Sequence, residues 1–223
     1  MLFMRNIQSD SSFWMKGSGC VKFFDVFKKK QCDICGSENG IFGNRKLQNG
    51  NICTSCAGNL SPLFSKRSNS TVEEIKKQLK YREMNKVKLQ SFNPDKSFGF
   101  KNKFLIDSEK KAFVVTDTDD YLKKNPDIIE FSQVASARYT VKENRTERKY
   151  KDDQGKRQSF SPPQYDYTYS FWVFVTVHSP WFDKIDVEIS SDKPHSKDEQ
   201  LYYDYEEEAK KIIDLLSRAN EQS

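Results

Sequence analysis

The amino-acid sequence predicts an α+β protein with a small four-cysteine zinc module, a connecting helix and an antiparallel β domain that ends in a helix. Three observations carry this prediction: two CxxC pairs near the N-terminus, a change of hydrophobic period from 3.6 to 2 after Gly99, and an amphipathic final segment. We therefore expect a flexible arm at residues 1–19, a zinc-binding module at 20–69, a connecting helix at 70–94 and the β domain at 95–223.

The N-terminal segment before the cysteine pairs is expected to contribute little to the fold. Gly17-Ser18-Gly19 predicts a hinge, so we expect the arm at 1–19 to be poorly ordered. Apolar positions between residues 21 and 27 predict a short helix or strand that packs on the zinc module, in preference to a membrane anchor. Cys20 lies outside the metal-binding spacing.

The two CxxC pairs predict a zinc site. Cys32 and Cys35 form the first pair, Cys53 and Cys56 form the second, and 17 residues separate the pairs. Each CxxC turn offers two sulfurs on one side, and tetrahedral zinc takes four such ligands. We expect positive φ at Gly36, where the chain must turn back. The expected zinc is structural, because four thiolates leave no coordination position open for catalysis.

The segment between and after the cysteine pairs leaves two module types open. Turn signals at Asn39-Gly40 and Asn49-Gly50 flank Ile41-Phe42 and Leu47, which predicts a small hairpin. A short helix after Cys56 would make the module treble-clef-like, and its absence would leave a ribbon.

The clearest predicted helix follows. Thr71 as N-cap and Glu74 three residues later form a capping box, and Asn93-Pro94 predicts that the helix ends near Gln90. A narrow apolar stripe is formed by Val72, Ile75 and Leu79. Basic side chains are expected to cover the rest of the helix: Lys76, Lys77, Lys80, Arg82, Lys86 and Lys88.

Period-2 alternation predicts the strands of the β domain. The expected strands are a hairpin at 104–106 and 112–115, an entry at 128–131, and alternating segments at 135–141, 165–177 and 185–189. The charged residues 142–158 are expected to form a loop with a turn at 152–155. Alternate residues from Tyr165 to Val177 are all expected on one buried face.

The final helix is expected to plug the curved sheet. Its apolar stripe consists of Ala209, Ile212, Ile213 and Leu216. Glu206, Glu207 and Glu208 are expected in its first turn, with Lys210 and Lys211 as i,i+4 partners of the first two.

These elements resemble two known groupings. The order of strands and helix over 100–218, with the segment 128–134, resembles the pleckstrin-homology-like superfold, particularly its bacterial members. Several motifs look like those of a family of uncharacterised proteins from Gram-positive bacteria and their phages: Cys32-Asp33-Ile34-Cys35-Gly36, Gly50-Asn51-Ile52-Cys53, Leu60-Ser61-Pro62, Ser70-Thr71-Val72-Glu73-Glu74-Ile75, Tyr81-Arg82-Glu83 and Phe92-Asn93-Pro94. That family is defined by an N-terminal zinc finger or ribbon. The resemblance implies metal ligands at Cys32, Cys35, Cys53 and Cys56, and it implies no activity.

Charge is distributed unevenly along the chain. Residues 1–90 contain 16 Lys and Arg against 7 Asp and Glu, whereas residues 91–223 contain 21 against 25. The basic half is a possible docking face for an anionic partner, and nucleic acid bound through residues 28–88 is the alternative function. The basic residues concerned are Lys28, Lys29, Lys30, Arg45, Lys46, Lys66, Arg67, Lys76, Lys77 and Lys80.

The favoured function is non-enzymatic binding of a protein partner in the cytoplasm. The sequence contains no nucleotide-binding or metalloprotease motif, and His178 and His195 are expected in surface loops. Trp172 and Phe174, opposite the core face, are expected to form either a second packed face, for which the zinc module is a candidate, or a partner site. No membrane-spanning segment is expected, and lipid binding is disfavoured by the acidic second half.

Overall fold

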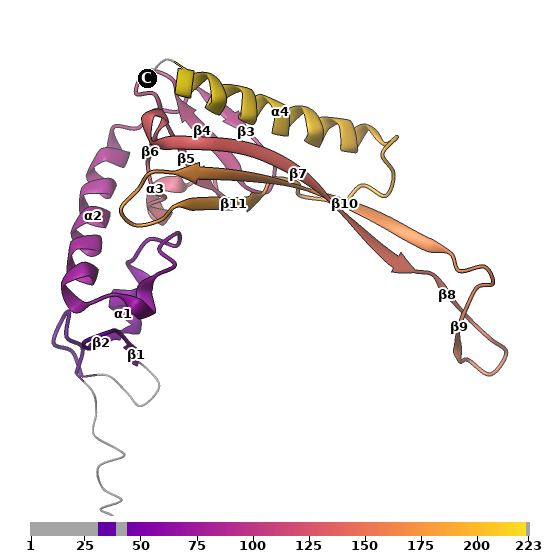
Figure 1. Cartoon of the computed structure of the whole chain (residues 1–223), viewed down its shortest axis with the longest axis horizontal. Coiled ribbons are helices and arrows are strands. Elements are labelled where there is room, and N and C mark those ends of the chain that lie inside the picture. Colours follow the sequence, from indigo (N-terminus) through magenta and orange to yellow (C-terminus); the bar gives the residue numbers. More distant parts are fainter. Residues whose placement is uncertain (1–30, 39–43, 222–223) are drawn as a thin grey trace, which may run out of the picture.

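The computed structural model describes residues 31–38 and 44–221. The predicted arm at 1–19, Cys20, the apolar segment before the first cysteine pair and Ile41-Phe42 lie outside the described residues. The described elements form a small cysteine-containing module, a long helix, two antiparallel sheets and a final helix (Figure 1). The predicted α+β class, with antiparallel sheets and a C-terminal helix, is confirmed.

The cysteine module is a hairpin followed by a short helix. Strand β1 (Asn44–Lys46) pairs with β2 (Asn51–Cys53), and the predicted Asn49-Gly50 turn joins them. Helix α1 (Thr54–Gly58) follows directly, so the observed order is that of the treble-clef-like alternative. A one-turn helix, η2 (Arg67–Asn69), leads to the connecting helix. The module has its own small core: Leu47, Ile52, Ala57, Leu60, Phe64 and Ile75.

Helix α2 (Val72–Gln90) has the predicted capping box. The backbone N–H of Glu74 donates to the Thr71 hydroxyl, and the Glu74 carboxylate accepts from the backbone N–H of Thr71 at 2.7 Å. Ile75 is fully buried, with Val72 and Leu79 half-buried beside it. The prediction that Arg82 belongs to the basic solvent face was wrong, because its guanidinium is buried against Asp127.

The first sheet contains the predicted hairpin and two strands beside it. Its four strands, in the order β3-β4-β5-β6, are β3 (Lys96–Phe98), β4 (Lys103–Asp107), β5 (Ala112–Thr116) and β6 (Ile129–Glu130). The pairing of β4 with β5 confirms the hairpin. A short helix, α3 (Tyr121–Lys124), lies between β5 and β6. Strand β3 was not predicted, because three residues with a single apolar side chain give no alternation.

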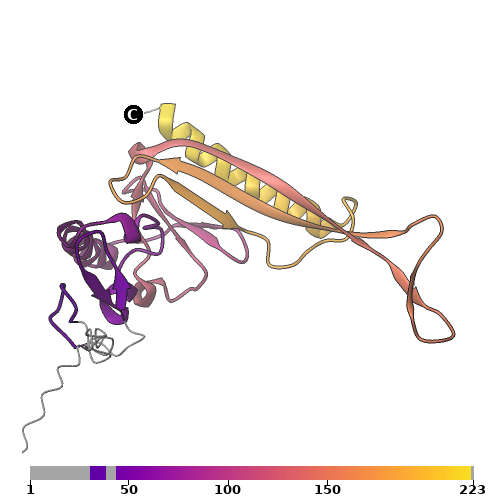
Figure 2. The same cartoon turned by 60° about the horizontal axis from the view of Figure 1, so that its bottom comes forward.

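The second sheet continues outward as a long two-stranded projection. After the turn η3 (Phe131–Gln133), its strands are β7 (Val134–Glu147), β10 (Tyr165–Val177) and β11 (Lys184–Glu188), in the order β11-β10-β7. A hairpin of β8 (Lys149–Lys151) and β9 (Arg157–Ser159) forms the tip. Figures 1 and 2 show this projection extending away from the rest of the molecule. We call residues 142–168 the β-arm.

Two predictions about this sheet were wrong. Residues 142–158 are not a loop, because β7 remains paired with β10 as far as Glu147 and Tyr165. Tyr165 and Tyr167 do not share the buried face of β10; Tyr169 is 7% exposed whereas Tyr167 is 36% exposed. The pleat keeps alternate side chains on one face, but only the inner part of the strand, from Tyr169 onward, contributes that face to the main core. The predicted turn at 152–155 is present, with Gly155 at φ 78°.

Helix α4 (Gln200–Glu221) runs along the second sheet and closes the main core (Figure 2). Ala209, Ile212 and Leu216 are buried as predicted, and Tyr205 joins them. The three glutamates at 206–208 are not in the first turn, because the helix begins at Gln200. The loop before it is fixed by Glu199, whose carboxylate accepts from two backbone N–H groups at 3.0 Å. Among the described residues, no helix is both long and apolar enough to span a membrane.

Candidate metal centre

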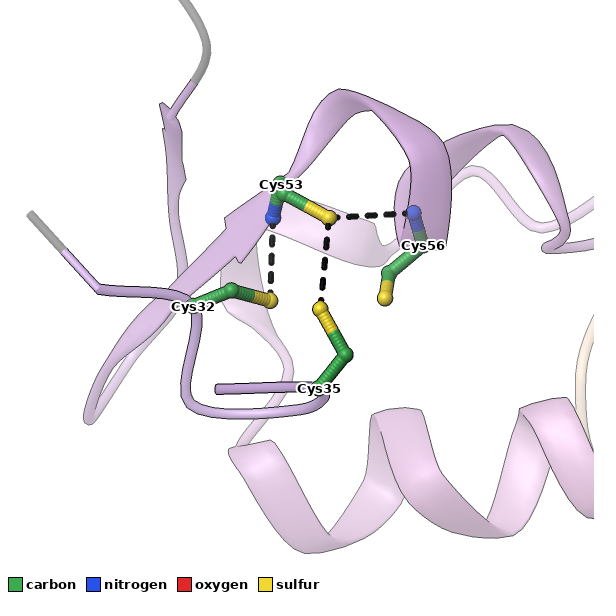
Figure 3. Close-up of side chains that lie close together, drawn as sticks. All are labelled: Cys32, Cys35, Cys53 and Cys56. Atoms are coloured by element: carbon green, nitrogen blue, oxygen red, sulfur yellow. Dashed lines mark hydrogen bonds between the residues drawn. The ribbon is translucent and has the colours of Figure 1, made fainter. Parts of the chain in front are cut away.

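The first cysteine pair lies on a tight knuckle. The backbone N–H of Gly36 donates to the carbonyl of Cys32 at 2.8 Å, and that of Cys32 donates to the carbonyl of Ser37 at 2.9 Å. Gly36 has the predicted positive φ, at 74°, which a side chain would strain. This turn directs the sulfurs of Cys32 and Cys35 to the same side of the chain (Figure 3).

The second pair lies where a strand becomes a helix. Cys53 is the last residue of β2 and the N-cap of α1, and its sulfur accepts from the backbone N–H of Cys56 at 3.3 Å. The backbone N–H of Cys53 in turn donates to the sulfur of Cys32 at 3.3 Å. The two pairs are therefore held in register by main-chain hydrogen bonds as well as by the hairpin.

All four sulfurs converge on one point. Their Sγ atoms lie within 4.8 Å of one another, and those of Cys35 and Cys53 are 3.8 Å apart (Figure 3). A disulfide would require about 2.05 Å. Tetrahedral zinc with Zn–S bonds of about 2.3 Å would separate its sulfurs by about 3.8 Å. The four cysteines are thus free thiols positioned to bind one metal ion.

The electrostatics of the cluster favour a bound cation. Hydrogen bonds from the side chain and backbone of Ser37 lower the pKa of Cys35 to about 6. Burial raises the pKa of Cys56, and the adjacent sulfurs of Cys53 and Cys35 raise it further. Four adjacent thiols therefore resist ionising together, because each thiolate makes the next less favourable. A divalent cation would remove that penalty, which makes this donor set suited to a metal.

The burial of the sulfurs indicates a structural role. Cys32 and Cys53 are 1% and 5% exposed, Cys56 is half-buried and Cys35 is exposed at the surface. Four sulfur ligands complete a tetrahedral site, so no position is left for substrate or water. The arrangement can therefore stabilise the module, whose own hydrophobic core is small.

Sequence reasoning missed the polar residues that support the cluster. Asp33, between the first two cysteines, accepts from the backbone N–H of Asn51 at 2.6 Å and so links the knuckle to β2. The Asn49 side chain accepts from the backbone N–H of Val72 at 2.8 Å and links the hairpin to α2. A polar residue inside the first CxxC pair was the available signal for Asp33. No local signal pointed to the role of Asn49 across 23 residues.

The other residues singled out from the sequence lie elsewhere. His178 and His195 are exposed in loops, as predicted. Trp172 and Phe174 are half-buried, but they do not pack on the cysteine module. Lys142 lies 3.5 Å above the Trp172 ring and Arg138 lies 4.3 Å above the Phe174 ring, so these aromatic side chains are covered by cations of β7.

The aromatic residue that does reach the cysteine module is Trp181. It contacts Phe64 edge-on, with ring centroids 5.9 Å apart, and it also packs against the main core. Its ring lies 6.0 Å from that of Tyr81 in α2. One side chain thus joins the module, the connecting helix and the sheet domain.

A buried ion pair forms a second connection between these parts. Arg82 Nη1 donates to Asp127 Oδ1 at 2.8 Å, with side-chain exposures of 7% and 1%. Ser61 donates to the other oxygen of Asp127 at 2.6 Å, and the Asn85 amide bonds the Asn125 side chain. The pair spans 45 residues of sequence, so no local pattern could reveal it.

Comparison with known proteins finds one similarity, and it covers the cysteine module. A family model described as a domain of unknown function (DUF4428) matches residues 30–78, which include all four cysteines and the start of α2. This match and the cysteine cluster fit the predicted resemblance to an uncharacterised family with a metal-binding module. The comparisons with curated proteins and with solved structures find no match.

Proposed function

We propose that this chain is a non-enzymatic, zinc-stabilised adaptor that recognises a protein partner. The observation that carries the proposal is the β-arm, residues 142–168, which projects beyond the packed sheets (Figures 1 and 2). An extended two-stranded ribbon of this kind exposes both faces and both edges. Most of its surface is therefore not used in packing the core and is available to a partner.

The composition of the β-arm supports protein recognition. Tyr150 and Tyr167 are 46% and 36% exposed, and Arg145 lies 4.3 Å above the Tyr165 ring. Tyr150 also contacts Phe160, with ring centroids 5.0 Å apart. Aromatic residues and arginine are enriched in protein interfaces, because they bury a large area and retain a polar group.

The tip of the β-arm is internally fixed. Asp152 accepts from the backbone N–H groups of Gln154 and Lys156 at 3.0 and 2.9 Å, and from the side chain of Gln158 at 2.9 Å. Strands β8 and β9 pair on either side of this turn. A surface that is already ordered loses less conformational entropy on binding, which favours affinity.

Zinc is the metal we propose for the cluster. An all-sulfur tetrahedral donor set suits Zn²⁺, and saturation of its four positions supports a structural and not a catalytic role. Free thiols in this arrangement also support a reducing, cytoplasmic location. The pleckstrin-homology-like architecture and an origin in Gram-positive bacteria or their phages belong to the same proposal; sheets of four and three antiparallel strands before one helix support the former.

The test removes the outer part of the β-arm, residues 149–163, without disturbing the fold. Arg148 donates from its backbone N–H to the carbonyl of Gln164 at 2.9 Å, so an Asn-Gly turn replacing residues 149–163 would close a hydrogen-bonded pair. A partner captured by a photo-crosslinker at Tyr150 is purified and its affinity measured by calorimetry. The shortened protein should retain one zinc and its melting temperature but lose the partner.

A single-residue variant sharpens this test. Tyr150→Ala should weaken binding of the purified partner about thirtyfold if this ring anchors the interface. Tyr203→Ala is the matched control, since Tyr203 is similarly exposed, at 51%, on α4. Equal affinity of the shortened and complete proteins would contradict a role for the arm, and turnover of a small molecule by the pure protein would contradict the non-enzymatic assignment.

Nucleic acid remains the second candidate, because basic residues of the module and α2 are exposed. These residues are Arg45, Lys46, Lys66, Lys76, Lys77 and Lys80, whereas Lys28, Lys29 and Lys30 lie outside the described residues. Binding would weaken steeply with salt, and replacing Lys76, Lys77 and Lys80 by Gln should reduce that dependence. The matched control replaces Lys149, Lys151 and Lys156 of the β-arm. No affinity for DNA or RNA at low salt would exclude this candidate.

A further inference from the structure

A groove separate from the cysteine module and the β-arm lies beside the C-terminal half of α4. It has a volume of about 690 Å³ and is bordered by β3, the β4–β5 turn, η3 and α4. Helix α4 contacts both β3 and η3, so the walls of the groove belong to one packed unit. This volume falls within the range of small-molecule sites, about 300–1,000 Å³.

The floor of the groove is apolar. Phe98 of β3, Phe131 of η3 and Leu215 of α4 line it, and all three are half-buried against the main core. A ligand with an apolar body would complete this burial, at about 25 cal/mol for each Å² removed from water.

The rim of the groove is positively charged. Five cations and two acids line the groove. Two of the cations are already neutralised: Lys110 by Asp107 at 3.6 Å, and Lys211 by Glu207 at 2.9 Å. One of the acids, Glu130, is paired with Lys88 outside the groove at 3.7 Å.

Three rim cations keep their charge available. Lys96, Lys111 and Arg218 have no ion pair among the described side chains, residues 31–38 and 45–218, and Asp214 is the one remaining acid that lines the groove. Asp95, adjacent to Lys96 in the chain, offsets part of the charge of that lysine, and the groove still joins an apolar floor to more cations than acids. Such a combination is complementary to an anion that carries an apolar group.

The backbone at Lys111 supports a role for this side chain beyond the turn. Lys111 has φ 50°, in the left-handed region that favours glycine or asparagine. Its conformation is fixed because its carbonyl accepts from the backbone N–H of Phe131 at 2.8 Å. Glycine or asparagine would adopt this backbone conformation with less strain than lysine. The feature that lysine supplies and these residues lack is a positive charge beside the groove.

Another hollow shows that this charge pattern is not general. A cavity of about 950 Å³ between α2 and α3 is also lined by several cations. There, Lys123 pairs with Asp120 at 2.5 Å and Lys124 pairs with Asp117 at 2.6 Å. Arg82 is likewise paired with Asp127. Of the four cations that line that hollow, Lys86 is the one without an ion pair among the described residues, whereas three of the five in the groove beside α4 have none.

We propose that the groove beside α4 binds a small organic anion that consists of an apolar body and one carboxylate or phosphate group. The apolar body would lie on Phe98, Phe131 and Leu215, and the anionic group would contact Lys96, Lys111 and Arg218. Residues 20–30 of this chain are not the expected occupant of the groove. They are apolar in part, but they contain four lysines and one aspartate, so their positive charge would be repelled by the cations of the groove. This proposal does not depend on the β-arm or on a protein partner.

The test uses a matched pair of fluorescent probes. Anilinonaphthalene sulfonate is an aromatic anion, and N-phenylnaphthylamine is the same ring system without the sulfonate. The full chain, loaded with zinc, should bind one equivalent of the anion about tenfold more tightly than the neutral compound. Equal affinity for the two probes would overturn the proposal, because it would reduce the groove to an apolar patch.

Variants locate the binding and separate it from folding. Lys111→Asn removes the cation and suits the left-handed backbone, so affinity for the anion should fall about fivefold while the melting temperature stays equal or rises. Arg218→Gln should weaken binding by a similar factor. Lys193→Asn, at an exposed loop lysine outside the groove, is the matched control. Unchanged affinity in both groove variants would overturn the proposal.

Displacement then defines the anionic group. Octanoate and octyl phosphate should each displace the probe, and the tighter of the two identifies a carboxylate or a phosphate ligand. Inorganic phosphate should not displace it at equal concentration, since it lacks the apolar body. Failure of both amphiphiles to displace the probe would overturn the proposal.

Discussion

The cysteine module and the sheet domain solve the same stability problem by different means. Among its described residues, 31–38 and 44–69, the core cluster of the module contains five buried apolar side chains, and α2 adds a sixth, Ile75. The sheet domain buries 17 in one continuous cluster. A core as small as that of the module cannot offset the entropy of ordering its loops, whereas the larger one can. The four sulfurs, once they hold a metal, would therefore supply the stability that the small core of the module cannot provide.

The two regions are nevertheless physically joined. Trp181 belongs to the surroundings of both cores, and Asp127 is bonded by Arg82 and by Ser61 of the module. Leu63 of the module also packs against the main core. Loss of structure in the module should therefore affect the sheet domain through a small number of contacts. Four predictions examine that division of roles, in order of decreasing effect.

The largest effect is expected from loss of the metal. Chelation, or Cys53→Ser, should abolish the fold of the module, because structural zinc contributes about 10–16 kcal/mol to zinc-finger peptides. Hydrogen exchange should accelerate at Ile52 while the amides of Phe113 and Val173 stay protected. Cys20→Ser is the control and should change neither zinc content nor stability. Unchanged protection of the Ile52 amide after complete chelation would contradict the idea that the metal stabilises the module.

The next largest effect concerns the core of the sheet domain. Phe171 is fully buried and contacts Tyr202 and Tyr205, with ring centroids 5.0 and 5.7 Å apart. Phe171→Ala should reduce the free energy of unfolding by about 3–5 kcal/mol in urea denaturation. Tyr167→Ala, on the same strand but in the β-arm, should cost less than about 1 kcal/mol. Comparable losses would mean that the arm is packed in solution.

The ion pair between α2 and the sheet domain should matter almost as much. Arg82→Met leaves Asp127 buried without its cation and should cost about 3 kcal/mol. Combining it with Asp127→Leu should recover much of that loss, since a buried pair can often be replaced by apolar residues. The double-mutant cycle is measured by urea unfolding. Additive losses would show that the two side chains act independently.

The smallest effect is a pH dependence within the sheet domain. Burial opposes ionisation of Asp107, but hydrogen bonds from the backbone N–H groups of Asn93 and Lys110, both 2.9 Å, outweigh it and hold the pKa of Asp107 below its ordinary value. Its stabilisation is therefore complete above about pH 4, the unfolded pKa, and is lost as pH falls through the folded value.

A variant at Asp107 tests whether the charge of this carboxylate is responsible. Asp107→Asn should cost about 1.5–3 kcal/mol at pH 7, the usual value of hydrogen bonds to a charged group. The difference from the unmodified protein should shrink as pH is lowered below 4, because the unmodified carboxylate then becomes protonated too. A difference independent of pH would assign the effect to shape and not to charge.

The sequence by itself determined the local elements and the identity of the cysteine cluster. The capping box of α2 joins residues three apart, each CxxC pair spans four residues, and the alternation of β10 is a property of consecutive residues. These signals depend on neighbours along the chain, so they can be recognised before any tertiary contact is known. The order hairpin, helix, antiparallel strands and final helix followed from them, whereas the expected single curved sheet is divided into two sheets in the structure.

Only the tertiary structure decided which of these surfaces are covered. The alternation of β10 is continuous from Tyr165 to Val177, yet its buried face ends at Tyr169 because the main core does not extend along the strand to Tyr167 and Tyr165. Arg82 has the same local pattern as the exposed lysines of α2 and is buried only because Asp127 lies opposite it. The groove beside α4 likewise combines residues from 96 to 218. Burial and charge pairing are set by distant partners, and a single sequence does not specify which distant partners meet.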